Sequence, residues 1–230
     1  MSTICIVQAR MGSSRFPEKA IKKISRFMLI EWVLKRVKKS KKIKKIVLAT
    51  TNLKQDDKLI KIAKKNNISF FRGSKKDVLS RFYQVALIHK PKLIVRVCAD
   101  NPFVDPILLD KLVRDFKYKN FDYAFNHQSK LKNKCADGFG GEIMNFEVLE
   151  RLNVGVKKLS LREHVTLYIW KNMKKFKIQS ISSPKNISFP KLRFDVDTKK
   201  DLNNLNNFVK KNKINLHTKA EKIVNLYRKK

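Results

Sequence analysis

The stretch TICIVQARMGSSRFPEK, which runs from Thr3 to Lys19, decides the fold of this chain. Its first five residues form a short apolar run, and the turn-forming Gly12 and Ser13 follow soon after. Such a run followed by turn residues predicts a buried strand that leads into a loop. In open α/β sheets, ligands collect beyond the carboxyl ends of the strands. We therefore expect a binding site at the loop from Gln8 to Lys19.

Short apolar runs and segments of helical periodicity alternate through the first half of the chain. We expect strands at residues 46–50, 68–71, 93–98 and 121–125, and helices at 28–37, 56–65, 77–89 and 105–118. Strands that alternate with helices imply right-handed βαβ units. The expected fold is therefore an α/β fold with a mostly parallel sheet and helices on both faces.

The alternation changes after about residue 126, where Gly138, Gly140 and Gly141 interrupt the chain. The later elements that we expect are a helix at 163–173, strands at 176–181 and 192–196, and helices at 199–211 and 218–227. No internal repeat and no linker rich in proline or glycine divides the sequence. We therefore expect one domain over residues 1–230, with a small inserted substrate or dimerisation lobe at about residues 127–185.

The formal net charge is +35, and it comes mostly from lysines spread along the whole chain. A basic balance can indicate a nucleic acid, an acidic membrane surface or an anionic substrate. The aromatic residues do not alternate with the basic clusters in a pattern typical of base stacking. A nucleic acid is therefore not expected as the main ligand. A solvated lysine surface that helps to attract anionic nucleotides is favoured.

Hydrophobic residues make up 43% of the chain, which predicts a folded globular protein. No apolar run approaches the roughly 18 residues that span a bilayer, and the first residues lack the basic segment of a signal peptide. We expect a cytoplasmic protein without membrane insertion. The cysteines Cys5, Cys98 and Cys135 lack CxxC spacing, which argues against a disulfide framework or a zinc site.

The loop after the first strand carries three cations, Arg10, Arg15 and Lys19, which suit the charge of a triphosphate. Gly12 allows the backbone to approach a phosphate closely, and Ser13 adds a hydrogen-bond donor. The loop matches neither the P-loop pattern nor GxGxxG. The alternative is a basic surface turn without a ligand.

Aspartates at the ends of two expected strands are candidates to hold a metal ion. Asp100 comes directly after the strand at 93–98, where it could hold Mg²⁺ against phosphate oxygens. Asp195 and Asp197 point to the same side if the strand continues, and one of them could complete this site. Each has a structural alternative: Asp100 could be a turn or cap residue, and Asp197 or Thr198 could cap the next helix.

Four further positions carry weaker signals. Arg72 ends the strand expected at 68–71 and could contact a base or ribose, although an ordinary turn explains it equally well. Asp137 and Glu142 lie where a substrate lobe would begin, and a plain turn is again the alternative. His164 lies at the start of an expected helix. No second ligand stands at zinc-binding spacing from it, so packing or capping is its alternative role.

These motifs together resemble the cytidylyltransferase family that includes the CMP-sialic acid and CMP-KDO synthetases, and above all its spore-coat polysaccharide biosynthesis branch. Members of that branch carry QARMGSxRLPGK after the first strand, and residues 8–19 match this motif at nearly every position. The further matches are residues 49–51, 71–74, 77–79, 96–102, 105–106, 162–166 and 196–198, in the same order along the chain. The ordered set is far more specific than any one motif.

The resemblance implies a Rossmann-like nucleotidyltransferase fold, CTP as the donor, Mg²⁺ as the cofactor and a homodimer. Carried over by position, Arg15, Lys19 and Asp100 would be catalytic, and Asp100 and Asp197 would hold the metal ion. The nucleotide-binding residues would be Gln8, Ala9, Arg10, Gly12, Ser13, Arg15, Lys19, Thr51, Arg72 and Asp100. The acceptor-binding residues would be Asn101, Asp137, Glu142, Arg162, Glu163 and His164.

The chain departs from the family pattern at two positions. Glu18 stands where the family usually has glycine, beside the expected phosphates, so its carboxylate needs solvent or a lysine to turn toward. Gly140 stands where the branch often has aspartate, next to the expected acceptor. The second departure bears on which acceptor the protein uses.

The expected function is transfer of CMP from CTP to an acidic sugar or a related acceptor, with release of pyrophosphate. Such a reaction would serve the biosynthesis of a surface polysaccharide or another glycoconjugate. The alternatives are a nucleotide- or RNA-binding protein of the same fold without transferase activity, or a transferase that uses another nucleoside triphosphate.

Overall fold

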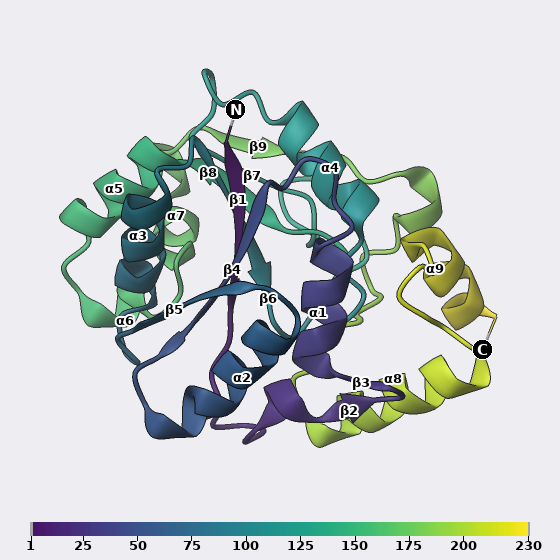
Figure 1. Cartoon of the computed structure of the whole chain (residues 1–230). Coiled ribbons are helices and arrows are strands. Elements are labelled where there is room, and N and C mark those ends of the chain that lie inside the picture. The colour runs from purple at the N-terminus through teal and green to yellow at the C-terminus, as the bar shows by residue number, and fades with distance from the viewer. Residues whose placement is uncertain (1, 230) are drawn as a thin grey trace.

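A computed structural model describes residues 2–229, and one β-sheet forms its centre. Residues 1 and 230 of the expected domain lie outside the described residues. Within them, seven strands form the sheet in the order β5-β4-β1-β6-β8-β7-β9 (Figure 1). The strands are β1 (Thr3–Gln8), β4 (Lys45–Thr51), β5 (Ser69–Gly73), β6 (Leu93–Cys98), β7 (Tyr123–Phe125), β8 (Glu142–Asn145) and β9 (Ile178–Ser180).

Strands β5, β4, β1 and β6 run parallel to one another. β1 is the middle strand of this group, and its Cys5 is paired with Ile46 on one side and Val95 on the other. The strands read as continuous apolar runs because both faces of a parallel sheet are covered by helices. β8 is antiparallel to β6 and β7, and β9 is parallel to β7. The predicted α/β fold with a mostly parallel sheet is confirmed, and β8 is its reversed strand.

The strand order changes direction at β1, and this change determines where a ligand can bind. The chain builds from β1 to β4 and β5 on one side and then crosses to β6 on the other. The connections that leave β1 and β6 therefore diverge and leave a crevice at their carboxyl ends. The loop that starts at Gln8 and the segment that starts at Ala99 both begin at this crevice.

Helices cover both faces of the sheet (Figure 1). One apolar cluster joins the sheet to α1 (Leu29–Val37), α2 (Asp57–Lys65) and α4 (Pro106–Asp115). A second cluster joins the opposite face to α3 (Val78–His89), α5 (Phe146–Gly155) and α7 (Leu167–Lys171). Tertiary burial of these apolar faces stabilises helices of such modest length.

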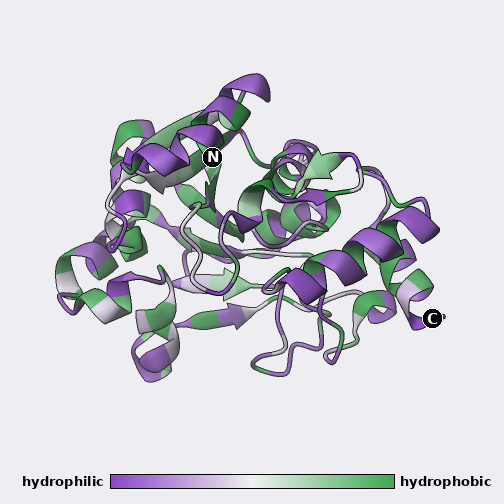
Figure 2. Ribbon diagram, turned by 90° about the horizontal axis from the view of Figure 1, so that it is seen from below, coloured by the Kyte–Doolittle hydropathy of each residue, from purple (hydrophilic) through white to green (hydrophobic). Residues whose placement is uncertain are grey.

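A third apolar cluster lies beside α1, away from the sheet. It contains residues of α8 (Lys199–Lys211), α9 (Ala220–Arg228) and the hairpin of β2 (Lys23–Ile24) and β3 (Phe27–Met28). The buried residues of α8 follow helical spacing, and Trp32 of α1 joins the same cluster. Figure 2 shows hydrophobic residues gathered in the interior and hydrophilic residues along the outer side of the helices.

Thr198 begins α8 with a capping box. Its hydroxyl accepts a hydrogen bond from the backbone N–H of Asp201, and the carboxylate of Asp201 accepts one from the backbone N–H of Thr198. This arrangement satisfies two of the free N–H groups at the helix start. Thr198 is therefore the cap of α8, which was the structural alternative for this residue. The side chain of Asp197 takes no part in the cap and can make other contacts.

The remaining elements are short. They are α6 (Leu159–Arg162) and the 3-10 turns η1 (Lys19–Ile21), η2 (Lys54–Asp56), η3 (Met173–Lys175) and η4 (Lys185–Ile187). Among residues 2–229, no helix is both long enough and apolar enough to cross a membrane.

The helix predicted at 163–173 is wrong in its extent. The chain forms α6, then an irregular segment, and then α7. The two ends of the irregular segment are held to different parts of the protein. Arg162 donates hydrogen bonds to Asp77 and to the carbonyl of Val156, whereas Thr166 donates to Glu142 of β8. A continuous helix could not make both sets of contacts.

The strand predicted at 192–196 is also wrong, because this segment makes a single bridge between Arg193 and Asp137. The backbone N–H of Phe194 donates to the carbonyl of Asp137, and that of Val196 donates to the carbonyl of Asp100. Two different partners replace one continuous ladder. Helix α5 and the hairpin of β2 and β3 were not predicted from the sequence.

Candidate active site

A pocket of about 370 Å³ lies at the crevice between the carboxyl ends of β1 and β6. The loop after β1, the start of α3 and the segment between α6 and α7 complete its walls. The residues that line it are Gln8, Ala9, Arg10, Ser13, Ser14, Arg15, Lys19, Ala20, Val78, Arg81, Arg96, Cys98, Ala99, Asp100, Glu163 and His164. The pocket lies where the strand order predicts a ligand site.

Buried contacts behind the pocket fix the shape of the loop after β1. The backbone N–H of Met11 donates a hydrogen bond of 2.7 Å to Asp56, and the carbonyl of Met11 accepts from the N–H groups of Ser13 and Glu18. Asp56 also accepts a hydrogen bond from the hydroxyl of Thr51. Thr51 is 1% exposed and supports the loop from behind, so it does not line the pocket.

Lys19 lies between two aspartates that are far apart in the sequence. Its ammonium is 3.4 Å from Oδ2 of Asp100 and 3.6 Å from Oδ1 of Asp197, and it donates a 2.6 Å hydrogen bond to the carbonyl of Val196. Nη1 of Arg15 lies 3.2 Å from Oδ2 of Asp197. The structure therefore brings together the two cations and the two carboxylates that the sequence assigned to phosphate and metal binding.

The pKa values of Asp100, which lines the pocket, and of Asp137, which lies behind it, are both raised. Burial raises the pKa of Asp100, and the charges of Asp195 and Asp197 raise it further, while the ammonium of Lys19 opposes them. Burial and the charge of Asp195 raise the pKa of Asp137 to about 6. Such crowding of carboxylates favours a cation between them.

The donor set at this end suits a hard divalent cation. Asp100 and Asp197 offer carboxylate oxygens, which Mg²⁺ prefers, and Mg²⁺ is commonly held by one or two carboxylates together with phosphate oxygens. Within residues 2–229, no group of three or more His, Cys, Asp or Glu side chains forms a complete metal cage. Asp100 and Asp197 by themselves fit a divalent cation that also takes ligands from phosphate oxygens.

The floor of the pocket rests on a buried ion pair between Arg96 and Glu142. Nε of Arg96 lies 3.3 Å from Oε1 of Gln8, and the hydroxyl of Tyr123 donates a 2.7 Å hydrogen bond to Glu142. Burial opposes ionisation of Glu142, but Arg96 and the Tyr123 hydroxyl outweigh it and lower the pKa of Glu142 to about 2. Glu142 lies beneath the pocket and holds Arg96 and, through it, Gln8.

The predicted acceptor-binding residues do not all reach the pocket. Glu163 and His164 line it, and Oε1 of Glu163 lies 3.3 Å from Nη2 of Arg10. Arg162 is 9% exposed and donates hydrogen bonds to the side chain of Asp77 and to backbone carbonyls of α5 and the residue after it. Asn101, Asp137, Glu142 and Arg162 are not lining residues, so any role they have in acceptor binding is indirect in this conformation.

Arg72 also lies away from the pocket wall. Its guanidinium lies 2.8 Å from Asp57 and donates hydrogen bonds to the carbonyls of Thr51 and Leu53. Gly12 lines an adjoining hollow with Arg10 and Glu163. Ser13 lines the pocket between β1 and β6, where a ligand-binding residue was expected.

Four lining residues were not predicted from the sequence: Val78, Arg81, Arg96 and Cys98. Arg96 and Cys98 carried a usable signal. They are two residues apart on an apolar strand, so they share one face, and an arginine there needs a buried partner. Cys98 lies at the pocket with its residue partly exposed, and the surrounding protein shields its thiol from water enough to raise the pKa to about 12. Arg81 carried no such signal, because arginine is ordinary on a helix.

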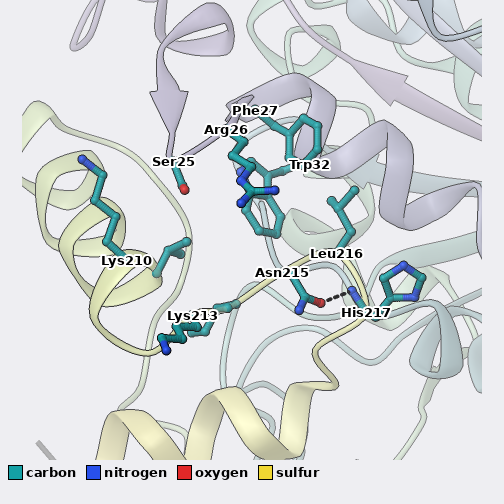
Figure 3. Close-up of a pocket in the computed structure, with 11 residues that line it drawn as sticks. Ser25, Arg26, Phe27, Trp32, Lys210, Lys213, Asn215, Leu216 and His217 are labelled. Carbon is teal, nitrogen blue, oxygen red and sulfur yellow. Dashed lines mark hydrogen bonds between the residues drawn. The ribbon is translucent and has the colours of Figure 1, made fainter.

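A second pocket of about 620 Å³ lies between the β2–β3 hairpin and the segment from α8 to α9. Figure 3 shows Lys210 and Lys213 on one side of it and the rings of Phe27 and Trp32 on the other. It is larger, but it shares no lining residue with the first pocket and has no carboxylate among its described residues. The smaller pocket, with its paired carboxylates and cations, is therefore the candidate active site.

Comparison with known sequences matches the family described as cytidylyltransferase over residues 4–230. The spore coat polysaccharide biosynthesis protein SpsF of Bacillus subtilis is 34% identical over 201 residues, which cover 85% of this chain and 81% of that protein. An uncharacterised protein of Methanocaldococcus jannaschii is 36% identical over 201 residues, which cover 87% of this chain and 80% of that protein.

Comparison with solved structures finds a cytidylyltransferase from Leptospira borgpetersenii. It is 29% identical, with a TM-score of 0.91, and the match covers 100% of this chain and 94% of that one. The family match spans almost all of the described residues, including every residue of the candidate active site. The chain therefore belongs to the cytidylyltransferase family and is an enzyme of the nucleotidyltransferase type.

Proposed function

We propose that the protein transfers CMP from CTP to an oxygen of an acidic sugar or a related acceptor and releases pyrophosphate. The observation that carries this proposal is the position of Lys19 between Asp100 and Asp197. A site that binds a triphosphate and a divalent cation needs phosphate-binding cations beside carboxylates. The family membership supports CTP as the donor.

In the proposed reaction, an oxygen of the acceptor attacks the α-phosphorus of CTP in line with the leaving pyrophosphate. Arg15 and Lys19 turn from the aspartates to the phosphates and stabilise the negative charge that develops on the pyrophosphate. Gly12 and Ser13 bring backbone and hydroxyl donors close to the phosphates. The fixed loop behind Met11 holds these donors in place before the nucleotide binds, which lowers the cost of reorganisation.

Mg²⁺ is the proposed cofactor, and Asp100 and Asp197 are the residues that would hold it. When bound, such an ion neutralises charge on the phosphate oxygens. The raised pKa of Asp100 supports this assignment, because a buried carboxylate beside other carboxylates gains most from a cation.

The acceptor is proposed to enter from the side of Glu163 and His164, which line the pocket with the segment between α6 and α7. His164 can donate a hydrogen bond to a carboxylate or hydroxyl of a sugar acid. The similarity to a protein named for spore coat polysaccharide biosynthesis supports an acceptor of this kind. The net charge of +35 also favours anionic substrates over cationic ones.

A screen of pyrophosphate release tests the proposal. Each of CTP, UTP, GTP and ATP is combined with Mg²⁺ and a panel of 2-keto-3-deoxy sugar acids and amino sugars. The expected result is pyrophosphate release that requires CTP, an acidic sugar and the cation, and that is lost in Asp100→Asn. Pyrophosphate release from UTP, GTP or ATP instead of CTP would contradict CTP as the donor. RNA binding that weakens steeply with salt, without release from any nucleotide, would favour the RNA-binding alternative.

The inserted lobe at about residues 127–185, the homodimer and the cytoplasmic location remain predictions. Residues in this range form β8, α5, α6, α7 and β9, so the segment also contributes to the main sheet and to one of its faces. Light scattering coupled to size exclusion tests the dimer. A monomer at micromolar concentration would contradict it.

A further inference from the structure

Arg81 of α3 is a buried cation that lacks a hydrogen-bond partner. The residue is 3% exposed and lines the candidate active site. Its Nε and Nη1 atoms are enclosed, and neither has an acceptor within the described part of the chain. A buried donor without an acceptor costs free energy, and native proteins rarely keep one unless a ligand or a function uses it.

The two carboxylates whose charges act on Arg81, those of Asp56 and Asp77, already accept hydrogen bonds from other groups. Asp56 accepts hydrogen bonds from the backbone of Met11 and from the hydroxyl of Thr51. Asp77 accepts from the backbone of Ser80 with one oxygen and from Arg162 with the other. These acids attract Arg81 without pairing with it. Burial, joined by the charge of Arg10, lowers the pKa of Arg81 to about 10, so the guanidinium is protonated and available at neutral pH.

The backbone of Gly73 makes room for the stem of Arg81. A Cβ atom at Gly73 would lie 2.6 Å from Cγ of Arg81 and 3.0 Å from a ring carbon of Phe71. Real Cβ atoms do not approach so closely, so a side chain at position 73 would force the stem of Arg81 to shift. Gly73 at the end of β5 therefore allows the guanidinium to reach the pocket wall.

Arg81 and Lys19 approach the pocket from opposite faces of the sheet. α3 covers one face, whereas η1 begins at Lys19 and its Ala20 belongs to the cluster of α1 on the other face. The phosphates and the cation are proposed to lie on the side of Lys19. The nucleoside then lies on the side of α3, where Val78 offers an apolar wall to a flat base.

We propose that Arg81 recognises the base of the donor nucleotide and selects cytosine over uracil. This inference rests on the proposed function, in which CTP is the donor. Cytosine presents two adjacent acceptors, O2 and N3, which match two neighbouring N–H groups of a guanidinium. Uracil carries a hydrogen on N3, so a donor would face a donor. A base that leaves a buried donor unpaired is rejected more strongly than one that merely fits poorly.

The experiment compares CTP and UTP in the wild type and in Arg81→Met, which keeps the stem and removes every donor. Both kcat/KM from pyrophosphate release and binding by calorimetry are measured. We expect the preference for CTP over UTP to fall on the order of 100-fold, mainly by loss of CTP. If Arg81→Met lowers kcat/KM equally for CTP and UTP, or leaves both unchanged, the inference is overturned and Arg81 has a structural role.

Two further variants separate the possible causes. Arg81→Lys keeps the positive charge but not the paired donors. This variant is therefore expected to discriminate between CTP and UTP as poorly as Arg81→Met does. If it restores the wild-type ratio, charge alone acts and the hydrogen-bonding inference is wrong. Gly73→Ala moves the stem of Arg81 and is expected to lower the same ratio. Arg114→Met, on an exposed part of α4, controls for the loss of one arginine, and thermal melting of all variants establishes folding.

The binding measurement distinguishes this inference from the proposed function. Wild-type protein that binds CTP more tightly than UTP, but releases no pyrophosphate with any acceptor, contradicts the proposed reaction and leaves the role of Arg81 intact. Wild-type protein that reacts with CTP, beside an Arg81→Met variant of equal selectivity, contradicts the role of Arg81 and leaves the reaction intact.

Discussion

Oε1 of Glu18 lies 2.7 Å from the ammonium of Lys58, at the end of the loop that surrounds the candidate phosphate site. Lys22 is the second cation beside this carboxylate, at 3.7 Å. Glu18 does not line the pocket, and the hydrogen bond and charge of Lys58 lower its pKa. The acid that replaces the usual glycine of the family is thus directed to lysines outside the phosphate site.

Glu18→Gly is expected to raise the melting temperature by a few degrees. The backbone angle φ of Glu18 is 55°, which lies in the left-handed region that favours glycine. The exposed ion pairs that the substitution removes contribute little. Thermal unfolding checks the prediction. Glu18→Gln is the control, because it removes the charge and keeps the backbone strain. A melting temperature that falls equally in both variants would show that the ion pair matters more than the strain.

Asp197→Asn is expected to lower kcat on the order of 100-fold, and Asp195→Asn much less. Asp197 contacts Lys19 and Arg15, whereas Asp195 is paired with Arg193, so only Asp197 has both proposed phosphate cations beside it. Steady-state kinetics at several Mg²⁺ concentrations measure the effect. A larger loss in Asp195→Asn would move the metal assignment from Asp197 to Asp195.

Glu142→Gln is expected to destabilise the protein by roughly 3 kcal/mol at neutral pH, because it leaves Arg96 buried without its charged partner. The folded-state pKa of Glu142 is lowered to about 2, whereas an unfolded glutamate has a pKa of about 4.3. The stabilisation by ionised Glu142 is therefore fully present above about pH 4.3 and is lost as the pH falls toward 2.

Urea unfolding of the wild type and of Glu142→Gln at pH 7 and pH 3 measures this dependence. The difference in the free energy of unfolding between the two proteins should be smaller at pH 3. A difference that is the same at both pH values would mean that the carboxylate is not selectively ionised in the folded state.

Gly140→Ala is expected to destabilise the protein by several kcal/mol, and Gly140→Asp at least as much. A Cβ atom at Gly140 would lie 2.2 Å from Oδ1 of Asn126 and 2.8 Å from its carbonyl oxygen. Asn126 is buried and joins the carbonyl of Leu108 to the backbone of Gly141, so it cannot move without breaking these bonds. The aspartate that the branch often carries here is thus incompatible with the present position of Asn126.

The matched control for Gly140 is Gly155→Ala at the end of α5. A Cβ atom at Gly155 has nothing within 4 Å, and alanine favours a helix. This substitution should leave stability unchanged or raise it by less than about 1 kcal/mol. Chemical denaturation measures both variants. Equal effects at Gly140 and Gly155 would contradict the steric argument.

The meeting of Asp100 with the loop after β1 could be predicted, because the carboxyl ends of parallel strands gather at one edge of the sheet. Asp197 was expected directly after a strand at 192–196, yet this segment forms no continuous ladder. It reaches Lys19 because the carbonyl of Asp100 accepts a hydrogen bond from the N–H of Val196. The pairing partner of an irregular segment is a tertiary contact, and no local pattern records it.

The buried positions of Glu142, Arg162 and Arg81 could not be predicted for a related reason. Glu142 and Arg162 are charged residues whose partners, Arg96 and Asp77, stand 46 and 85 positions away in the sequence. Arg96 and Glu142 face each other because β8 pairs antiparallel with β6, and Arg162 meets Asp77 at the start of α3. Charged residues on a helix usually face solvent, so nothing local indicates that Arg81 is buried.

The contact between Lys19 and Val196 spans 177 positions of the chain, and that between Arg15 and Asp197 spans 182. Synthesis on the ribosome delivers the phosphate loop early and these partners late. A nascent chain that stops before these partners therefore cannot assemble the candidate active site, even if the first βαβ units have already folded. A protein cut short near residue 190 would keep the loop that decides its fold and would lose Asp197, one of the two carboxylates proposed to hold the metal ion.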